Sequence, residues 1–376
     1  MAKMRFWGIT GTNGKTTTTW MLAEFLGAAY ITTVEVNTLR RRFYTGYTTP
    51  PLAQLKEIYA EMEAAGAKDC AMEVSSHAIH QNRVGFGETT VFAGGAFTNL
   101  SEDHLDYHKT MEEYFRVKLS FAERLAESVN ARPDCGRREF PPFVVCIDGG
   151  YGREMLEAAG RLPLNVIPVT FTRPRFDLSG FRLVGDYNKS NVLVAAALAE
   201  AAGVPHDEIQ RKIPTLAPRW GRLERVENPC VRAEVYVDFA HTPDGLEKVL
   251  SSVRGIAKGR LWVVFGAGGD RDPMKRPLMG EACARLADRL VVTSDNPRSE
   301  DPDAIIGDIL KGVGRRDGVA VEPERRAAIA YALENAAEGD VVVIAGKGHE
   351  TTQEIKGVKH PFDDREVVRL WRGAAS

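Results

Sequence analysis

Residues 9–26, ITGTNGKTTTTWMLAEFL, decide the fold class, because a short apolar run ends there in glycines and small polar residues and a helix-length stretch follows. Such an order is typical of a strand, a tight turn and a helix that begins at the turn. The backbone N–H groups of the turn and of the helix N-terminus can surround phosphate oxygens. The stretch therefore predicts a nucleotide-binding loop.

Two side chains of this loop carry specific expectations. Lys15 is expected to reach the β- and γ-phosphates, and Thr16 to ligate Mg²⁺. The spacing departs from GxxxxGK[ST], since the leading glycine is Gly11 and Ile9 stands five residues before Gly14. A glycine turn that only caps a helix is the alternative, but it requires neither the lysine nor the threonine run. The candidate nucleotide ligands in the loop are Gly11, Thr12, Asn13, Gly14, Lys15, Thr16 and Thr17.

Short apolar, β-branched runs recur between helix-length amphipathic stretches along the chain. This alternation predicts an α/β fold, with a P-loop domain on a mostly parallel sheet followed by a Rossmann-like α/β domain. Ligands bind beyond the carboxyl ends of parallel strands, so the polar segments after each run are the places to search for a site. The predicted strands are residues 4–10, 70–74, 91–98, 143–147, 235–239, 261–265, 290–294 and 341–345.

The length predicts two domains, because 376 residues exceed the roughly 250 to 300 that one hydrophobic core supports. The stretch Pro214–Arg222, PTLAPRWGR, lies between a helical pattern and a new strand and contains two prolines and a glycine. We therefore expect one domain over residues 1–218 and a second over residues 219–376, with a hinge near Trp220.

Composition and charge exclude several classes of protein. Apolar residues make up 44% and charged residues 27%, which excludes a disordered, collagen-like or coiled-coil chain. A net charge of −2 lacks the basic footprint of a nucleic-acid binder. The five cysteines form no CxxC pair, and no signal peptide or membrane-spanning apolar run is found. We expect a cytoplasmic monomer that acts on small molecules, without a nucleic-acid or membrane partner.

A carboxylate and a histidine suggest a metal site. Glu73 interrupts the apolar strand run CAMEV near its carboxyl end. Because burying a carboxylate is costly unless it meets a cation, a metal ion is the expected partner. His104 in SEDHLDYH is a candidate second ligand, although a loop histidine is also common as plain polar surface.

The next segment places a lysine on an apolar helix face. Thr110 and Glu113 form a T-x-x-E capping box that predicts a helix start, and Lys118 falls on the apolar face of that helix. A core-facing lysine has to pair, lose its proton or be modified. The alternatives are snorkelling to the rim and an ion pair with a neighbouring carboxylate.

Taken together, these segments resemble the Mur ligases, and most closely the members that add the third peptide residue, meso-diaminopimelate or lysine, to UDP-MurNAc-L-Ala-D-Glu. The resemblance extends from residue 8 to residue 368 in the family's order. It is carried by ITGTNGKTTTT, MEVSSHAIHQNRV, FTNLSEDHLDYHKTMEEYFRVK, GDYNKSN, GRLERV, VDFAHTPDGL, GGDRDPMKRPLMG, TSDNPRSEDP, AGKGHETTQ and FDDREV.

The resemblance implies ATP and Mg²⁺ as cofactors. Thr16, Glu73 and His104 match magnesium ligands, and Lys118 matches a carbamylated lysine. The implied catalytic residues are Lys15, Glu73, His104 and Lys118. Only a neutral amine takes up CO₂, and the resulting carbamate is an anion suited to magnesium. Positions that hold the adenine, ribose and phosphates of ATP are matched by Asn188, Arg222, Asp238 and His241.

The implied reaction is acyl activation. An acceptor carboxylate attacks the γ-phosphate while two Mg²⁺ ions and Lys15 offset the charge, and the acyl phosphate then reacts with an amine to give an amide and phosphate. Residues 1–218 would supply the phosphate loop and metals, and residues 219–376 the ribose and amine contacts. Domain closure is therefore expected for turnover.

The implied amine is meso-diaminopimelate, because DNPR is the version of the specificity motif that resembles the diaminopimelate-adding members. The guanidinium of Arg298 would take the carboxylate that lysine lacks, and Glu350 would read the distal ammonium. DNP and GKG are also ordinary turn and strand-end sequences, which is the alternative. The implied amino-acid ligands are Arg271, Asp295, Asn296, Arg298, Gly346 and Glu350.

The acceptor is implied only in part. Three-domain Mur ligases of this type carry a UDP-holding domain before the phosphate loop, whereas the loop begins here at Gly11. We therefore expect an acceptor without UDP, such as a peptide or small acid that ends in a D-Glu-like carboxylate, or UDP that is held weakly or by a partner. The implied acceptor ligands are Thr48, Thr49, Ser75, Gln81 and Arg83.

Three functions compete at this point. The first is a diaminopimelate-type peptidoglycan ligase with a reduced acceptor site. The second is an ATP-dependent amide ligase of a specialised metabolite or another cell-wall polymer. The third is a nucleotide-binding descendant without catalysis, which the retained lysines and the strand carboxylate argue against.

Overall fold

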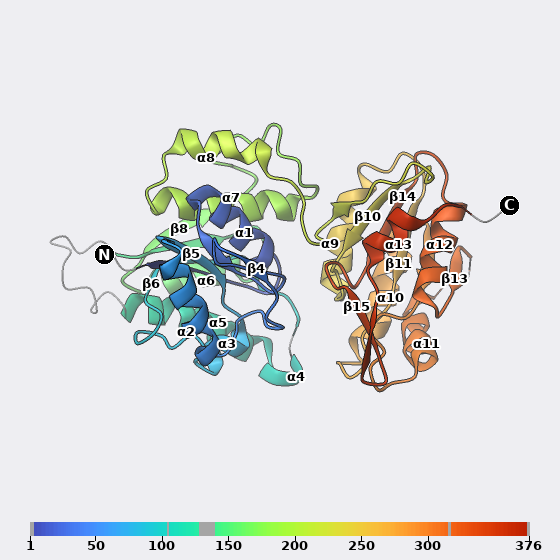
Figure 1. The fold of residues 1–376 in the computed structure, drawn as a ribbon, viewed down its shortest axis with the longest axis horizontal. Helices are drawn as coiled ribbons and strands as arrows, with labels where there is room; N and C mark the ends of the chain where they lie inside the picture. The colour runs from blue at the N-terminus through green and yellow to red at the C-terminus, as the bar shows by residue number, and fades with distance from the viewer. Residues whose placement is uncertain (1–3, 104, 128–139, 315–316, 374–376) are drawn as a thin grey trace. The chain divides into compact units, whose positions relative to one another are not determined.

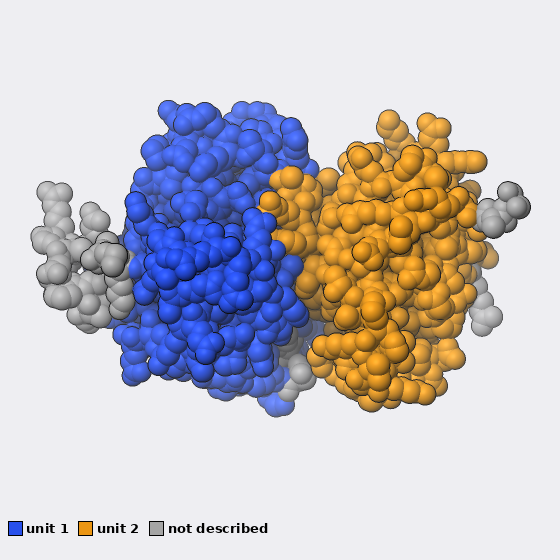
Figure 2. Space-filling model, viewed as in Figure 1, with its two compact units in different colours: residues 1–182, 186–216 blue, residues 183–185, 217–376 orange. Residues whose placement is uncertain are grey.

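The computed structural model describes the chain except residues 1–3, 104, 128–139, 315–316 and 374–376. It consists of two compact units (Figure 2). Unit 1 comprises residues 1–182 and 186–216, and unit 2 comprises residues 183–185 and 217–376. The main change of unit therefore falls within the stretch Pro214–Arg222.

Unit 1 is built on an eight-stranded sheet in the order β4-β3-β2-β5-β1-β6-β7-β8 (Figure 1). The pairs from β2 to β8 are parallel, and β3 and β4 add antiparallel pairs at one edge. Its strands are β1 (Arg5–Thr10), β2 (Ala29–Ile31), β3 (Val36–Asn37), β4 (Arg42–Phe43), β5 (Asp69–Glu73), β6 (Phe92–Phe97), β7 (Pro142–Cys146) and β8 (Asn165–Val169).

Helices pack on this sheet and bury its apolar side chains. Helices α2, α5 and α6 contribute to one hydrophobic core with the strands, while α1 and α7 pack against each other and on the strands. The helices of unit 1 are α1 (Lys15–Leu26), α2 (Leu52–Ala64), α3 (Ser76–His80), α4 (Leu105–His108), α5 (Met111–Glu127), α6 (Gly152–Ala159), α7 (Asp186–Ala201) and α8 (His206–Lys212).

The helix predicted after Thr110 is confirmed as α5. The Thr110 hydroxyl accepts a hydrogen bond from the Glu113 N–H at 3.1 Å, as a capping residue does. The reciprocal half of the predicted capping box is absent, because the Thr110 N–H donates instead to the His108 carbonyl at 2.7 Å. Lys118 lies on the buried face of α5, as its spacing predicts.

Unit 2 is a second α/β body, on a six-stranded sheet in the order β13-β12-β11-β14-β10-β9. The pairs from β13 to β10 are parallel, and β9 is antiparallel to β10. Its strands are β9 (Glu224–Arg225), β10 (Glu234–Asp238), β11 (Leu261–Phe265), β12 (Arg289–Val292), β13 (Val319–Val321) and β14 (Val341–Ala345), with β15 (Thr352–Ile355) and β16 (Val358–Pro361) as a separate hairpin.

The parallel strands of unit 2 alternate with helices, which is the arrangement of a Rossmann-like domain. The helices are α9 (Pro243–Arg254), α10 (Lys275–Leu286), α11 (Pro302–Val313), α12 (Arg325–Asn335) and α13 (Asp364–Leu370), and a 3₁₀ turn at Ile213–Thr215 ends unit 1. The predicted α/β fold class is confirmed in both units. Among the described residues, no helix is long and apolar enough to cross a membrane.

Candidate functional site

The loop between β1 and α1 requires glycine at two positions. Gly11 has φ +146° and Gly14 has φ +83°, a backbone region that side chains disfavour. A Cβ atom on Gly11 would lie 1.9 Å from the Thr98 Oγ1, and one on Gly14 would lie 2.2 Å from the Asn191 Oδ1. The loop can therefore take this shape only without side chains at these positions.

The segment after β6 holds the backbone of the loop in place. The Thr12 N–H donates to the Asn99 carbonyl at 2.8 Å, and the Asn13 N–H donates to the Asn99 Oδ1 at 3.0 Å. The Thr98 hydroxyl donates to the Asn13 carbonyl at 2.7 Å. These bonds organise the loop before any ligand arrives, which lowers the entropic cost of binding.

Lys15 and Thr16 begin helix α1 at the end of the loop. The Lys15 ammonium donates to the carbonyls of Gly11 at 2.9 Å and Thr12 at 2.7 Å, so it lies over the loop itself. Thr16 is buried in the first turn of α1, together with Thr17. The positive end of the α1 dipole and the Lys15 ammonium thus both lie at this loop.

Asn188 reaches the same region from helix α7. Its side-chain oxygen accepts a hydrogen bond from the Asn191 amide at 3.2 Å, and Asn191 in turn accepts from the Thr18 hydroxyl at 3.3 Å. Asn188 is therefore linked to α1 through one intermediate side chain. This joins two sequence motifs that lie 170 residues apart in the chain.

Glu73 ends strand β5, next to β1 in the sheet. Its side chain is buried, with an exposed fraction of 1%. One carboxylate oxygen accepts from the Thr33 N–H at 2.7 Å and the other from the Thr33 hydroxyl at 3.1 Å. None of the ion pairs among the described residues includes this carboxylate, so a buried negative charge is left for a cation.

Lys118 is buried on α5, with an exposed fraction of 1%. Its ammonium nitrogen lies 4.8 Å from the centre of the Tyr114 ring, and the Tyr114 hydroxyl accepts from the Thr12 hydroxyl of the phosphate loop at 3.2 Å. Burial lowers the pKa of Lys118 well below its ordinary value, Lys15 lowers it further and Asp103 acts against the shift. The neutral amine is thereby favoured.

A magnesium site at these residues would depend on oxygen ligands of more than one kind. Among the described residues, no group of three or more histidine, cysteine or carboxylate side chains gathers closely enough to hold a metal ion. Besides Glu73, such a site would need further oxygen ligands, and the Thr16 hydroxyl and a carbamate on Lys118 would be of that kind. The fourth predicted ligand, His104, lies outside the described residues.

Three of the predicted acceptor ligands surround the end of β5. The Thr49 hydroxyl donates to the Glu73 carbonyl at 2.8 Å and accepts from the Ser75 N–H at 3.1 Å. The Thr33 hydroxyl lies within hydrogen-bond distance, 3.1 Å, of the Thr48 hydroxyl. Thr33, which sequence reasoning missed, thus joins Glu73 to Thr48.

The other two predicted acceptor ligands follow helix α3. The Arg83 guanidinium donates to the Gln81 Oε1 at 2.7 Å, and the Gln81 amide donates to the Tyr107 hydroxyl at 3.2 Å. The same hydroxyl lies 2.8 Å from the His80 Nδ1. These side chains form a polar cluster between α3 and α4, on the surface of unit 1.

In unit 2, Asp238 ends strand β10 in the centre of a hydrogen-bonded turn. Its carboxylate accepts from the Leu223 N–H at 2.6 Å and from the Ala240 N–H at 2.7 Å. Burial raises the pKa of Asp238, whereas Arg222 and these N–H groups act against the shift. The turn therefore fixes Asp238 and Arg222 in one neighbourhood.

An aromatic ring connects the remaining nucleotide candidates of unit 2. The Arg222 guanidinium carbon lies 4.6 Å from the centre of the Phe239 ring, which also contacts the His241 ring at 4.6 Å and the His349 ring at 5.0 Å. Cation–π contact of this kind holds a guanidinium in place without neutralising it. Arg222 and His241 thus both contact the Phe239 ring.

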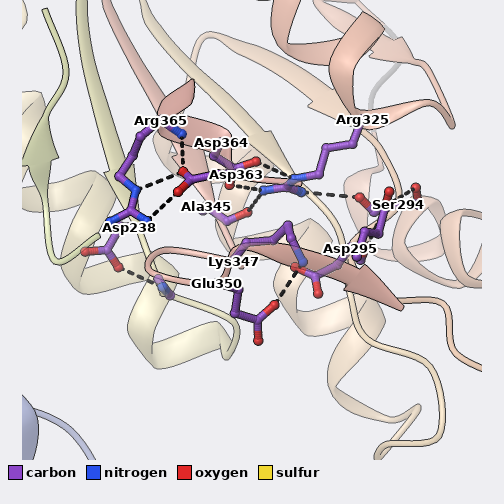
Figure 3. A network of polar contacts seen from close by, with 12 residues as sticks. Asp238, Ser294, Asp295, Arg325, Ala345, Lys347, Glu350, Asp363, Asp364 and Arg365 are labelled. Atoms are coloured by element: carbon purple, nitrogen blue, oxygen red, sulfur yellow. Dashed lines mark hydrogen bonds and ion pairs between the residues drawn. The ribbon is translucent and has the colours of Figure 1, made fainter. Parts of the chain in front are cut away.

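Of the predicted amino-acid ligands, Asp295 follows β12 and Glu350 follows β14, and both are labelled in Figure 3. The Asn296 amide donates to the Glu350 Oε2 at 2.8 Å, which joins the DNPR and GKGHE segments directly. Lys347 donates to both side chains, to the Asn296 Oδ1 at 3.0 Å and to the Glu350 Oε2 at 2.9 Å. Sequence reasoning missed Lys347, although it stands inside the quoted motif.

Arg298 is held in an unusual backbone conformation, with φ +52°. Its N–H donates to the Glu354 carbonyl at 3.0 Å, and its guanidinium donates to the Gly269 carbonyl at 2.6 Å. The Glu354 carboxylate lies 3.8 Å from the Arg298 Nε. Arg271 is exposed, and its guanidinium donates to the Asp270 carbonyl at 2.9 Å.

Asp295 and Gly346 approach each other closely. Gly346 has φ +117°, and a Cβ atom on it would lie 2.3 Å from the Asp295 Oδ2. That oxygen is buried and has no hydrogen-bond partner among the described residues. A buried carboxylate oxygen without a partner is costly, which marks this point as a place for a ligand donor.

The buried ion pair of Arg325 and Asp364 contacts the residues just before the DNPR and GKGHE segments. The Arg325 guanidinium binds both oxygens of Asp364 at 2.8 Å and donates to the Ser294 carbonyl at 3.3 Å and the Ala345 carbonyl at 3.0 Å (Figure 3). It therefore ties the residues that precede DNPR and GKGHE to helix α13. No sequence pattern indicated this pair.

Two family models match this chain in the order of the two units. The Mur ligase middle domain matches residues 9–199, and the domain described as "Mur ligase, glutamate ligase domain" matches residues 221–348. The chain belongs to the Mur ligase family. Members of this family are ATP-dependent ligases, which confirms the predicted enzyme class.

Named relatives of this Mur ligase agree with the predicted branch of the family. A protein named UDP-N-acetylmuramoyl-L-alanyl-D-glutamate--2,6-diaminopimelate ligase from Aquifex aeolicus is 41% identical over 378 residues, which are 96% of this chain and 76% of the relative. A protein of the same name from Synechococcus elongatus is 42% identical over 389 residues, 96% of this chain and 75% of the relative. The chain thus spans about three-quarters of the relatives it matches.

Solved structures support the fold of this Mur ligase. A structure titled UDP-N-acetylmuramoyl-L-alanyl-D-glutamate--2,6-diaminopimelate ligase matches with a TM-score of 0.63 and 32% identity, over 98% of this chain and 78% of the other. A pseudomurein peptide ligase type C from Methanothermus fervidus matches with a TM-score of 0.64 and 17% identity, over 93% and 77%. The second likeness supports the fold alone.

Proposed function

We propose that this Mur ligase joins meso-diaminopimelate to the carboxylate of a muramoyl-dipeptide-like acceptor, with ATP converted to ADP and phosphate. The observation that carries the proposal is the direct hydrogen bond between Asn296 and Glu350 beside Arg298. These side chains offer an acceptor for an ammonium and a guanidinium for a carboxylate, in a chain 41% identical to a relative named as a diaminopimelate ligase.

The first step is activation of the acceptor carboxylate. Its oxygen attacks the γ-phosphate of ATP, the bond to the β-phosphate oxygen breaks, and an acyl phosphate and ADP result. Lys15 and the N–H groups of the loop offset the negative charge that develops on the transferred phosphoryl group. The tight hydrogen bonding of Thr12 and Asn13 supports a loop that is ready for this role.

Thr16, Glu73, His104 and a carbamylated Lys118 would hold magnesium. Magnesium supplies charge neutralisation to the phosphates when it is bound. The buried Glu73, which makes no ion pair with a described residue, and the buried, readily deprotonated Lys118 support this assignment. Lys118 takes up CO₂ as a neutral amine and releases one proton, so an anion replaces the lysine at the site.

The acceptor peptide would bind beside Glu73. Thr48, Thr49 and Ser75 offer hydroxyl and N–H groups next to the carbonyl end of β5, and Gln81 and Arg83 offer an amide and a positive charge beyond α3. A guanidinium is suited to a carboxylate or phosphate of the acceptor. This placement would present the reacting carboxylate near the phosphate loop, because β5 and β1 are neighbours in the sheet.

The second step is attack of the amine on the acyl carbon. The tetrahedral intermediate then collapses, phosphate leaves, and the nitrogen gives up a proton as the amide forms. Arg271, Asp295, Asn296, Arg298, Gly346 and Glu350 would hold the distal end of diaminopimelate so that its other amine is presented. ATP contacts from Asn188, Arg222, Asp238 and His241 complete the proposed assignment. A monomer that works in the cytoplasm would suffice for this chemistry.

The proposal is tested by coupling two measurements in one reaction. The chain is incubated with ATP, Mg²⁺, meso-diaminopimelate and either UDP-MurNAc-L-Ala-D-Glu or the bare L-Ala-D-Glu dipeptide, and phosphate and amide are both quantified. Equal amounts of phosphate and diaminopimelate amide support the proposal, and the two acceptors reveal whether UDP is required. If phosphate and amide form with neither of the two acceptors, the proposal is contradicted.

A further inference from the structure

Lys347 is a fully buried lysine with two anchored partners. Its exposed fraction is 0%, and its ammonium donates to the Asn296 Oδ1 at 3.0 Å and to the Glu350 Oε2 at 2.9 Å. A buried ammonium is costly, so its retention at a loop that follows a strand calls for a specific role. Both of its partners belong to the proposed amino-acid pocket.

The contacts of Lys347 fix how Asn296 is oriented. The Asn296 Oδ1 accepts from Lys347 and also from the Glu354 N–H at 2.9 Å. With two donors on the oxygen, the amide nitrogen must point the other way, where it donates to the Glu350 Oε2 at 2.8 Å. An unrestrained asparagine would be able to flip and place its oxygen against the carboxylate.

The same contacts leave one Glu350 oxygen for a ligand. The Oε2 accepts from both Lys347 and Asn296, whereas the Oε1 takes part in none of the hydrogen bonds found among the described residues. The Glu350 side chain is 32% exposed, so this oxygen is within reach of a ligand. Lys347 therefore helps to fix the Glu350 Oε2, while the Oε1 stays open to a ligand.

Lys347 also sets the charge around this point. Three cationic side chains near Glu350 have carboxylate partners, and the Asp295 Oδ2 is a buried oxygen for which no hydrogen-bond partner is found in the described part of the chain. The group can accept one further positive charge at Asp295 or Glu350, and Arg298 can accept one negative charge. The pairs are Lys347–Glu350, Arg298–Glu354 and Arg325–Asp364.

We propose that Lys347 is a positioning residue that determines which amino acid this pocket prefers. It orients Asn296 and Glu350 and neutralises one carboxylate, so that the pocket favours a distal end with both an ammonium and a carboxylate over an end with an ammonium alone. The inference rests on the proposed function, because it concerns the choice between meso-diaminopimelate and lysine in the same reaction.

Removal of the Lys347 charge is expected to affect the two amines unequally. Without it the pocket carries one more negative charge, which attracts the cationic end of lysine, whereas at the zwitterionic end of diaminopimelate attraction of the ammonium is offset by repulsion of the carboxylate. A loss of packing alone would weaken both amines. The ratio of the two kcat/KM values therefore reports on charge and orientation, not on general damage.

The test compares four variants with the unchanged chain, using phosphate release with meso-diaminopimelate or lysine at saturating ATP and acceptor. Lys347→Met and Lys347→Gln both remove the charge. Lys347→Gln keeps a hydrogen-bond donor and takes the place of Lys347→Met if the methionine variant does not fold. Lys347→Arg keeps the charge. Lys311→Met is the matched control, because Lys311 forms the same i,i+3 kind of ion pair with Asp308 but is 71% exposed.

The expected result is a fall of about tenfold or more in the preference for diaminopimelate over lysine in the charge-removing variants. Lys347→Arg should retain most of the preference, and Lys311→Met all of it. An unchanged ratio in a folded Lys347→Gln or Lys347→Met variant would overturn the inference while leaving the proposed function intact. Failure of the unchanged chain to use diaminopimelate would instead refute the proposed function.

Discussion

Glu73 receives both of its side-chain hydrogen bonds from one residue, Thr33, through the backbone N–H at 2.7 Å and the hydroxyl at 3.1 Å. These neutral donors orient the carboxylate without cancelling its charge. The Thr33 hydroxyl also lies 3.1 Å from that of Thr48, so the proposed metal ligand and the proposed acceptor contact share one positioning residue. A displacement of Thr48 is thereby able to reach the Glu73 carboxylate through a single side chain.

Lys15→Ala is expected to reduce phosphate release by about a hundredfold or more, because it removes the cation that offsets charge on the transferred phosphoryl group. Phosphate release is measured with saturating acceptor and amine. The thermal unfolding midpoint of the variant serves as the control for folding, since the ammonium also donates to two carbonyls of its own loop. Activity within tenfold of the unchanged chain would remove Lys15 from the proposed mechanism.

Lys118 is expected to carry a carbamate when CO₂ is present. Growth of a carbamate signal in ¹³C NMR with labelled bicarbonate, and its loss in Lys118→Met, would report the modification directly. Activity should fall in CO₂-free buffer and return when bicarbonate is added, because only the carbamate offers an anion at this buried position. Full activity of Lys118→Met would contradict the assignment.

Gly14→Ala is expected to lower the free energy of unfolding by roughly 1–3 kcal/mol, since it combines a positive φ with overlap between the new methyl group and Asn191. Gly27→Ala is the matched control, because Gly27 also has a positive φ but nothing lies within 4 Å of its Cβ position. Denaturant unfolding of both variants measures the difference. Equal losses would show that contact with Asn191 contributes nothing.

Arg298→Ala is expected to reduce kcat/KM for meso-diaminopimelate by about tenfold or more relative to lysine, because a charge-assisted contact with the distal carboxylate is lost. ATP binding, measured separately by calorimetry, should stay unchanged. Arg285→Ala provides a control, since Arg285 forms an ion pair with Glu247 at the surface of unit 2. A preference that survives in Arg298→Ala would show that another group binds the carboxylate.

His349 is expected to destabilise unit 2 in acid. Burial and the positive charge of Arg222 lower the pKa of His349 to about 3, whereas an unfolded histidine has a pKa of about 6.5. The unfolded chain therefore binds a proton that the folded chain refuses, and stability falls as the pH decreases from about 6.5 towards 3. Denaturant unfolding of His349→Gln should depend less steeply on pH in this window. Equal slopes would contradict the shift.

Much of the fold was predictable because the strands that form the sheet centres are buried on both faces. Strands β11 and β14 match the predicted residues 261–265 and 341–345, and the other six predicted strands differ by one or two residues at an end. Short edge strands such as β3 and β4 were not predictable, since two residues carry no periodicity. They exist because a neighbouring strand offers hydrogen bonds.

The site shows the same division between local and distant signals. Glu73 and Lys118 stood out because a charged residue interrupts an apolar pattern, and both are buried. Thr33 carried no such signal, because a threonine in a polar loop is ordinary. The Arg325–Asp364 pair joins residues 39 positions apart, and only the folded chain brings them together.

The most direct test of the central claim is the stoichiometry of product formation from ATP, meso-diaminopimelate and a D-Glu-ended acceptor. One amide and one phosphate should form for each ATP consumed, with diaminopimelate preferred over lysine. Preference for lysine, or ATP consumption without an amide, would contradict the claim that this Mur ligase is a diaminopimelate-adding enzyme.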